Sequence, residues 1–316
     1  MASSVHQRLP GDLLHSRMKH SPTSATVPGG SGRRGRRYRG VAASWALGPK
    51  FHRRGKEDYV KRSRRLHSLA WLVLMATLVA GLAISLKTAR AEVPSRPPTF
   101  SNPLNINNAF FPFQPGGLKV YAGSDHGTKV KAIDHYLTAT RTFRLNGKNV
   151  ACHILVEEAY EDGELVERSL NYFAQADDGA VYYFGEVVNI YANGVIVSHE
   201  GSWLVGGATL PSDPPGIGNA PQPGLFMPAN PELGDVFKQE DLFPIVDETD
   251  EVVGIDLDVL VPAGKYDGAI AINESSRLDP ATEIKWYAPG VGVVKVQAKG
   301  ETLRLESSTL GQSQDK

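Results

Sequence analysis

The chain has 316 residues with 34 basic and 34 acidic side chains, and these charges are separated along the sequence. Up to Ala91 there are 18 Lys and Arg against 3 Asp and Glu, so a basic part of about +15 precedes an acidic part of about −15. The acidic balance argues against nucleic-acid binding by the second part, and the single cysteine, Cys152, excludes an internal disulfide.

Residues 1–58 are predicted to be a disordered basic extension. They contain GGSGRRGRRYRG at Gly29–Gly40 and few large apolar side chains, so they lack the material for a core. Three interpretations stay open: a start codon assigned too early, with initiation near Val60; a cytoplasmic tail that touches anionic lipid or nucleic acid; or an organellar transit peptide.

Residues 59–91 are predicted to be a signal peptide or a signal anchor. The segment 69–86 carries no charge and follows a basic run, and Ala89 and Ala91 provide the small residues that signal peptidase accepts. We expect cleavage between Ala91 and Glu92. Eighteen apolar residues are also about enough to span a bilayer, so an uncleaved membrane anchor is the alternative. The positive-inside rule places the C-terminal domain outside the cytoplasm in both cases, as a periplasmic or secreted domain.

The remaining chain is predicted to be all-β, an antiparallel meander of eight to eleven strands that forms a curved sheet or half-barrel. Val294 and Val296 alternate with Lys295 and Gln297, as in a strand with one dry face, and Ile255, Leu257, Val259 and Val261 are expected to share a face in the same way. Tight hairpin turns are predicted at Asn146-Gly147, Asp162-Gly163, Asp178-Gly179, Asn193-Gly194 and Lys299-Gly300. The predicted boundaries are a linker at 92–107, the β domain at 108–308 and a disordered tail at 309–316.

Residues 206–234 interrupt this pattern because Pro and Gly are dense there. We predict a long loop that crosses one sheet; the alternative is a division of the fold into 100–205 and 235–308. A single sheet is preferred because two separate parts would leave exposed edges.

Several phrases resemble a family of uncharacterised bacterial exported proteins. They are Asn108–Gly116, Tyr121–Gly123, Met227–Pro231 with Gly234-Asp235, Val261–Tyr266 and Trp286–Lys295. The resemblance covers roughly residues 105–306 and implies a fold similar to the open half-barrels of lipoprotein-sorting periplasmic carriers. It implies no catalytic residues.

Two groups of side chains are candidates for a site. The aromatic residues Tyr183, Trp203, Phe226 and Trp286 could line a ligand groove, although such residues also serve as core. The acidic residues Asp247, Asp250 and Glu251 could gather oxygen ligands for Ca²⁺, but the run that holds them lacks the spacing of a calcium loop and is interpreted first as a solvated face. No other cofactor is expected. Cys152 is expected to be buried and inert, and Asp125-His126 is expected to face opposite ways on a strand.

The sequence therefore predicts an exported domain that is not an enzyme and binds an apolar ligand or an envelope protein. Its other expected partner is the membrane, through 69–86. The alternative is an extracytoplasmic hydrolase or calcium-binding module that uses acidic residues near 206–251.

Overall fold

The computed structural model describes residues 97–311, which belong to one compact unit of the chain. These residues form strands and turns without a helix, so the all-β prediction is confirmed. None of them builds a helix long and apolar enough to cross a bilayer. The predicted extension 1–58 and export segment 59–91 lie outside the described residues.

The strands fall into three groups along the chain. The first group is β1 (Leu118–Asp125), β2 (Thr128–Leu145), β3 (Lys148–Glu161), β4 (Glu164–Gln175) and β5 (Val181–Ala192). Short strands follow, namely β6 (Val195–Ser198), β7 (Trp203–Val205), β8 (Gly218–Ala220) and β9 (Gly224–Met227). The last group is β10 (Val236–Leu242), β11 (Val246–Val261), β12 (Gly264–Ser275), β13 (Glu283–Ala288), β14 (Gly292–Ala298) and β15 (Glu301–Ser308).

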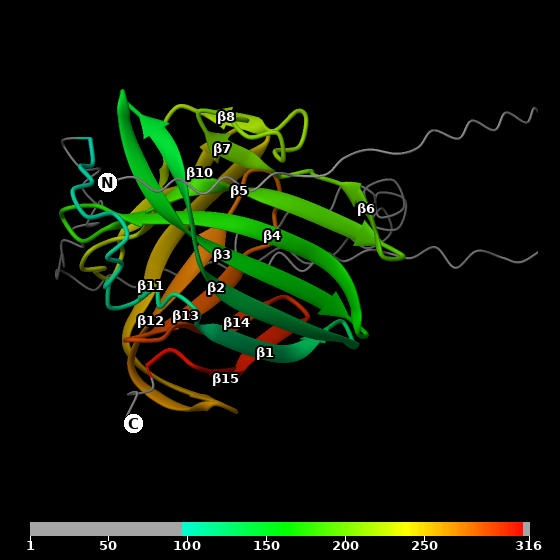
Figure 1. Cartoon of the computed structure of the whole chain (residues 1–316). Helices are drawn as coiled ribbons and strands as arrows, with labels where there is room; N and C mark the ends of the chain where they lie inside the picture. Colours follow the sequence, from blue (N-terminus) through cyan, green and yellow to red (C-terminus); the bar gives the residue numbers. More distant parts are fainter. Residues whose placement is uncertain (1–96, 312–316) are drawn as a thin grey trace, which may run out of the picture. The chain divides into compact units, whose positions relative to one another are not determined.

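The strands form one sheet because the last strand, β15, pairs with the first, β1. The order along the sheet is β10-β11-β12-β13-β14-β15-β1-β2-β3-β4-β5-β7-β8. Figure 1 shows the two meanders meeting where β1 and β15 lie side by side. The single sheet is therefore confirmed within the described residues. The predicted number of strands was too low, and β8 and β9 lie inside the segment 206–234 that was expected to be one loop.

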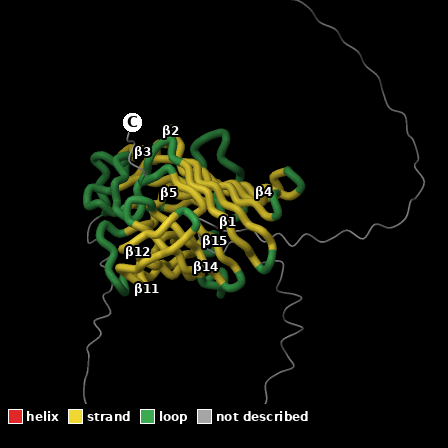
Figure 2. The backbone as a smooth tube through the Cα atoms, turned by 90° about the horizontal axis from the view of Figure 1, so that it is seen from below, coloured by secondary structure: helices red, strands yellow, loops and turns green. Residues whose placement is uncertain are grey.

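The sheet curls round on itself, as Figure 2 shows from below, and its end strands β8 and β10 lie near each other in Figure 1. Strand β9 pairs with β5 and also touches the end strand β10. A Cβ added to Gly224 of β9 would lie 1.8 Å from the carbonyl oxygen of Gln239 in β10, so only glycine allows this approach of two backbones. The sheet is therefore a nearly closed barrel whose inner face is shielded from solvent.

Three of the five predicted hairpin turns, including the one at Asn193-Gly194, have positive φ at both residues, whereas at Asp178-Gly179 and Lys299-Gly300 only the glycine does. Asn146 and Gly147 have φ angles of 50° and 80°, and Asp162 and Gly163 have 47° and 90°. The same conformation at His126-Gly127 was not predicted, because histidine is an unusual first residue for such a turn.

The ends of the domain extend beyond the predicted boundaries. Thr99 and Ser101, in the segment predicted as a linker, donate hydrogen bonds to the carboxylate of Asp177. Farther along, Ile106 is buried. At the other end, Leu310 is buried in the same core cluster. Residues 97–107 and 309–311 are therefore packed against the barrel.

Candidate functional site

The inner face of the barrel carries a row of charged side chains. Residues directly opposite each other on neighbouring strands share a face of the sheet. Lys119 of β1 is opposite Asp134 of β2, which is opposite Glu157 of β3. Farther round the barrel, Asp250 of β11 is opposite Glu274 of β12.

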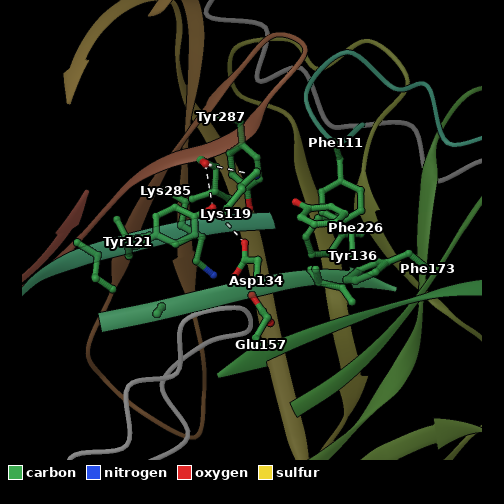
Figure 3. A pocket seen from close by; sticks show the side chains of 15 residues that line it. Phe111, Lys119, Tyr121, Asp134, Tyr136, Glu157, Phe173, Phe226, Lys285 and Tyr287 are labelled. Atoms are coloured by element: carbon green, nitrogen blue, oxygen red, sulfur yellow. Dashed lines mark hydrogen bonds between the residues drawn. The ribbon is translucent and has the colours of Figure 1, made fainter. Parts of the chain in front are cut away.

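A cavity of about 40 Å³ lies among these side chains. This is room for roughly three water molecules. In Figure 3 the charged residues and Tyr121 lie toward one side of it, and phenylalanines lie toward the other. The lining residues are Phe111, Lys119, Tyr121, Ala132, Asp134, Tyr136, Leu155, Glu157, Phe173, Phe226, Lys285, Tyr287, Val293, Val296 and Leu303.

Lys119 is a buried cation on the wall of this cavity, with 2% of its surface exposed. Within residues 97–311 its ammonium donates one hydrogen bond, a long one of 3.5 Å to the carbonyl oxygen of Val293. Burial lowers the pKa of Lys119 to about 8, and the negative charges of Asp134 and Glu157 oppose that change. The ammonium therefore keeps unused donor capacity in a place from which bulk water is excluded.

The hydroxyl of Tyr121 connects two acceptors beside Lys119. It lies 3.1 Å from Oδ2 of Asp134 and 3.0 Å from the carbonyl oxygen of Val293. Burial, and then the charge of Asp134, raise the pKa of Tyr121 well above its usual value. Tyr121 is thus a neutral donor that holds Asp134 in position.

A second group, which we call the acidic trio, consists of Glu248, Asp250 and Glu274. One oxygen from each carboxyl lies within 4.8 Å of the other two. Lys285 donates a hydrogen bond of 2.6 Å to Oε2 of Glu274 and lies 3.4 Å from Oε1 of Glu283. Burial and then the charge of Glu274 raise the pKa values of Glu248 and Asp250 well above normal.

The structure separates the three residues predicted to bind metal. Asp250 belongs to the acidic trio, but the carboxylate of Asp247 is held by Lys238 and Arg277, each with a contact of 2.7 Å. Glu251 is exposed. The interpretation of this run as a solvated face is wrong for Asp247, Glu248 and Asp250, whose side chains are buried, and holds for Glu251.

Three of the four predicted aromatic residues come together. The ring centroid of Tyr183 lies 5.2 Å from that of Trp203 and 6.1 Å from that of Phe226, and Phe226 also lines the cavity. Trp286 lies elsewhere: it packs on the second core cluster, and the ammonium of Lys295 is 4.2 Å from its ring centroid.

Sequence reasoning missed Lys119, Tyr121, Asp134 and Lys285. A usable signal exists for Asp134, since it takes the middle place between Ala132 and Tyr136 on a buried face of period two. In the hydrophobic pattern Asp134 is only a polar residue at a position expected to be apolar. The pairing of β1 with β2 shows that it is opposite Lys119.

The cysteine and histidine expectations have different outcomes. Cys152 is buried, as expected, and burial raises its thiol pKa well above normal. The expectation that Asp125 and His126 face apart was wrong: Nδ1 of His126 lies 2.6 Å from Oδ1 of Asp125, because His126 is in a turn and not in a strand.

A further pair of acidic side chains lies at the end of β1, where Glu301 of β15 is opposite Asp125. Burial, followed by the charge of Asp125, raises the pKa of Glu301 from 4.5 to about 7. The folded state binds the proton of Glu301 more tightly than the unfolded state does. Protonated Glu301 therefore stabilises the fold below pH 4.5, and this contribution is lost as the pH rises toward 7. Allowing for partial exposure, we expect a loss of about 2 kcal/mol in the free energy of unfolding.

The test is urea unfolding of the wild type and of Glu301→Gln between pH 4.5 and 7.5. Gln imitates the protonated carboxyl, so the variant should lack this part of the pH dependence. Glu306→Gln, at an exposed position of the same strand, is the control and should retain it. Equal pH profiles for the wild type and Glu301→Gln would show that Glu301 has an ordinary pKa.

Comparison of the chain with protein-family models, curated proteins and solved structures gives no match. The resemblance to exported bacterial proteins therefore stays a prediction.

Proposed function

We propose that the barrel is an exported, non-enzymatic binding domain that holds a compact amphipathic ligand in the cavity at Lys119. Export is inferred from the basic run and apolar segment that precede the domain in the sequence. The observation that carries the binding proposal is the buried ammonium of Lys119, which has one long hydrogen bond and faces a cavity. A buried charged donor without good acceptors is costly, so an oxygen atom of a ligand fits there.

The shape and charge of the cavity limit the ligand. Its volume of about 40 Å³ favours a molecule of a few non-hydrogen atoms over a lipid. Phe111, Phe173 and Phe226 offer an apolar wall for one end of such a molecule. The carboxylates of Asp134 and Glu157 balance Lys119, which favours an uncharged ligand over an anion.

A binding role fits the lining residues better than hydrolysis does. No serine, cysteine or histidine is among the fifteen residues that line the cavity within 97–311. Asp134 is the carboxylate that comes nearest to a general base there, but it already accepts a hydrogen bond from Tyr121 and lies opposite Lys119. The hydrolase alternative also drew on Asp247, whose carboxylate is already bonded to two cations.

Ligand-detected NMR on the purified full chain tests the proposal, with acetone and propan-1-ol as uncharged probes and acetate as the anionic one. We expect saturable binding of an uncharged probe by the wild type, with an affinity at least tenfold weaker in Lys119→Met and in Phe226→Trp, which fills the apolar end. Lys131→Met alters an exposed lysine of β2 and should bind as the wild type does. Equal binding by Lys119→Met and wild type, or no binding of any probe, contradicts the proposal and leaves a cavity that holds water.

A further inference from the structure

The acidic trio adjoins the Lys119 cavity through Lys285, which lines the cavity and is bonded to Glu274, although none of the three carboxyl groups lines it. The fold assembles the trio from two strands. Glu248 and Asp250 are two residues apart on β11 and therefore point to the same side of the sheet. Glu274 is opposite Asp250 on β12. Their exposed fractions are 1%, 1% and 0%, so bulk water does not solvate these carboxyl groups.

The charge at the acidic trio is not balanced by protein groups. Three carboxylates share the ammonium of Lys285, which is bonded to Glu274 and also lies near Glu283. Buried carboxylates need protons, cations or hydrogen-bond donors to offset the loss of water. With Lys285 counted against the acidic trio alone, full ionisation leaves a deficit of two charges, and Glu283 and Glu240 add further negative charge nearby, so a divalent cation would offset much of it.

Oxygen atoms without partners point to a ligand at the same place. Oε2 of Glu248 and Oδ1 of Asp250 are buried and have no hydrogen-bond partner. Gln239, an uncharged residue of β10 that is fully buried, donates its amide N–H to Oε1 of Glu248, and the oxygen of this amide also has no partner. Carboxylate and amide oxygens are the ligands that hard divalent cations prefer.

We propose that Glu248, Asp250 and Glu274 bind one divalent cation inside the barrel, with the amide oxygen of Gln239 as a further ligand. Calcium is the candidate that the experiment uses, because it accepts about six to eight oxygen ligands in flexible geometry, whereas magnesium demands a near-ideal octahedron and usually keeps several waters. Calcium bonds to oxygen are about 2.3–2.6 Å long, and the oxygen atoms of the acidic trio, all within 4.8 Å of one another, lie close enough to share one such ion.

The burial of the acidic trio determines how the site is tested. An ion reaches it most readily while the barrel folds, so the full chain is unfolded, treated with a chelator and refolded with either CaCl₂ or EDTA. We expect one tightly held calcium ion per refolded chain by elemental analysis after gel filtration, and a higher midpoint of thermal unfolding in calcium.

Matched variants locate the ion. Asp250→Asn and Glu248→Gln keep the side-chain volume and each remove one charge, so we expect calcium affinity at least tenfold weaker in both. Glu251→Gln, an exposed neighbour on β11, should retain the ion. Terbium luminescence excited through Trp203 gives a second readout, because the indole donates a hydrogen bond of 2.9 Å to Glu240, which is opposite Glu248 on the sheet.

Wild-type protein that refolds fully in EDTA and CaCl₂, and binds neither calcium nor terbium, overturns the proposal. Infrared absorption of protonated carboxyl groups at pH 7 that is lost in Asp250→Asn would then identify protons as the neutralising charge. Binding that persists in Asp250→Asn and Glu248→Gln also overturns it, by placing the ion elsewhere. Ligand binding at Lys119 is tested separately, by the Lys119→Met and Phe226→Trp variants, because Lys285 both lines that cavity and is bonded to Glu274.

Discussion

Replacing Asp213 with Ala is expected to lower the free energy of unfolding by about 3–5 kcal/mol, because it leaves the guanidinium of Arg141 buried and unpaired. Two parallel hydrogen bonds of 2.8 Å join the two side chains, which are 6% and 2% exposed. The same carboxylate accepts the backbone N–H groups of Thr209 and Leu210. Asp213 thereby fastens the Pro- and Gly-rich segment 206–234 to strand β2, and its loss should also expose this segment to proteases. Urea unfolding and limited proteolysis of the full chain measure the two effects.

Two controls separate burial from the mere presence of an ion pair. Asp267→Ala breaks a contact of 2.6 Å to Lys265, but these side chains are 72% and 57% exposed, so we expect no measurable loss of stability. The double variant Arg141→Met with Asp213→Ala removes both buried charges and should be more stable than Asp213→Ala alone. Equal losses for Asp213→Ala and Asp267→Ala would mean that the Arg141 pair is solvated in solution.

The parts of the fold that were predicted correctly are determined by residues close together in the sequence. The hairpins at Asn146-Gly147 and Asp162-Gly163 follow from residues that tolerate positive φ. Val294 and Val296 are buried, as the alternation of β14 predicts. The same reasoning failed for Ile255, which is exposed, because the pairing of β11 with β12 is irregular around Gly254 and shifts the faces of the strand.

The parts that were missed depend on residues far apart in the chain. The pairing of β1 with β15 joins residues near 120 to residues near 305, and no local pattern specifies it. Glu248 and Asp250 belong to a run of acidic residues, which hydropathy places in solvent, and only the closed sheet encloses them. Sites made of charged residues inside a barrel are therefore the hardest to find from sequence. Their charged side chains predict a solvent-exposed face, although the closed sheet buries them.

Lys119 is expected to make the domain more stable as the pH rises above 8, which is opposite to the usual behaviour of a paired lysine. The folded-state pKa is about 8, because burial disfavours the ammonium, whereas the ordinary value is 10.5. Between these pH values the unfolded chain binds more protons than the folded chain, so the free energy of unfolding rises with pH. The expected contribution is about 3 kcal/mol between pH 8 and 10.5.

The measurement is urea unfolding at several pH values from 7 to 10.5 for the wild type and Lys119→Met. The difference between their free energies of unfolding gives the contribution of Lys119 at each pH. This difference is needed because ionisation of tyrosines in the unfolded chain works in the opposite direction near pH 10. Four buried tyrosines, Tyr121, Tyr136, Tyr183 and Tyr287, have pKa values raised mainly by burial.

Lys131→Met, which removes an exposed lysine, should show the same pH profile as the wild type. If the wild type and Lys119→Met have parallel profiles, the ammonium is solvated and the cavity is open to bulk water. A compact ligand would then gain little at Lys119, since water already satisfies its donors. The pH profile therefore tests, without knowledge of the ligand, the physical condition on which binding at this cavity depends.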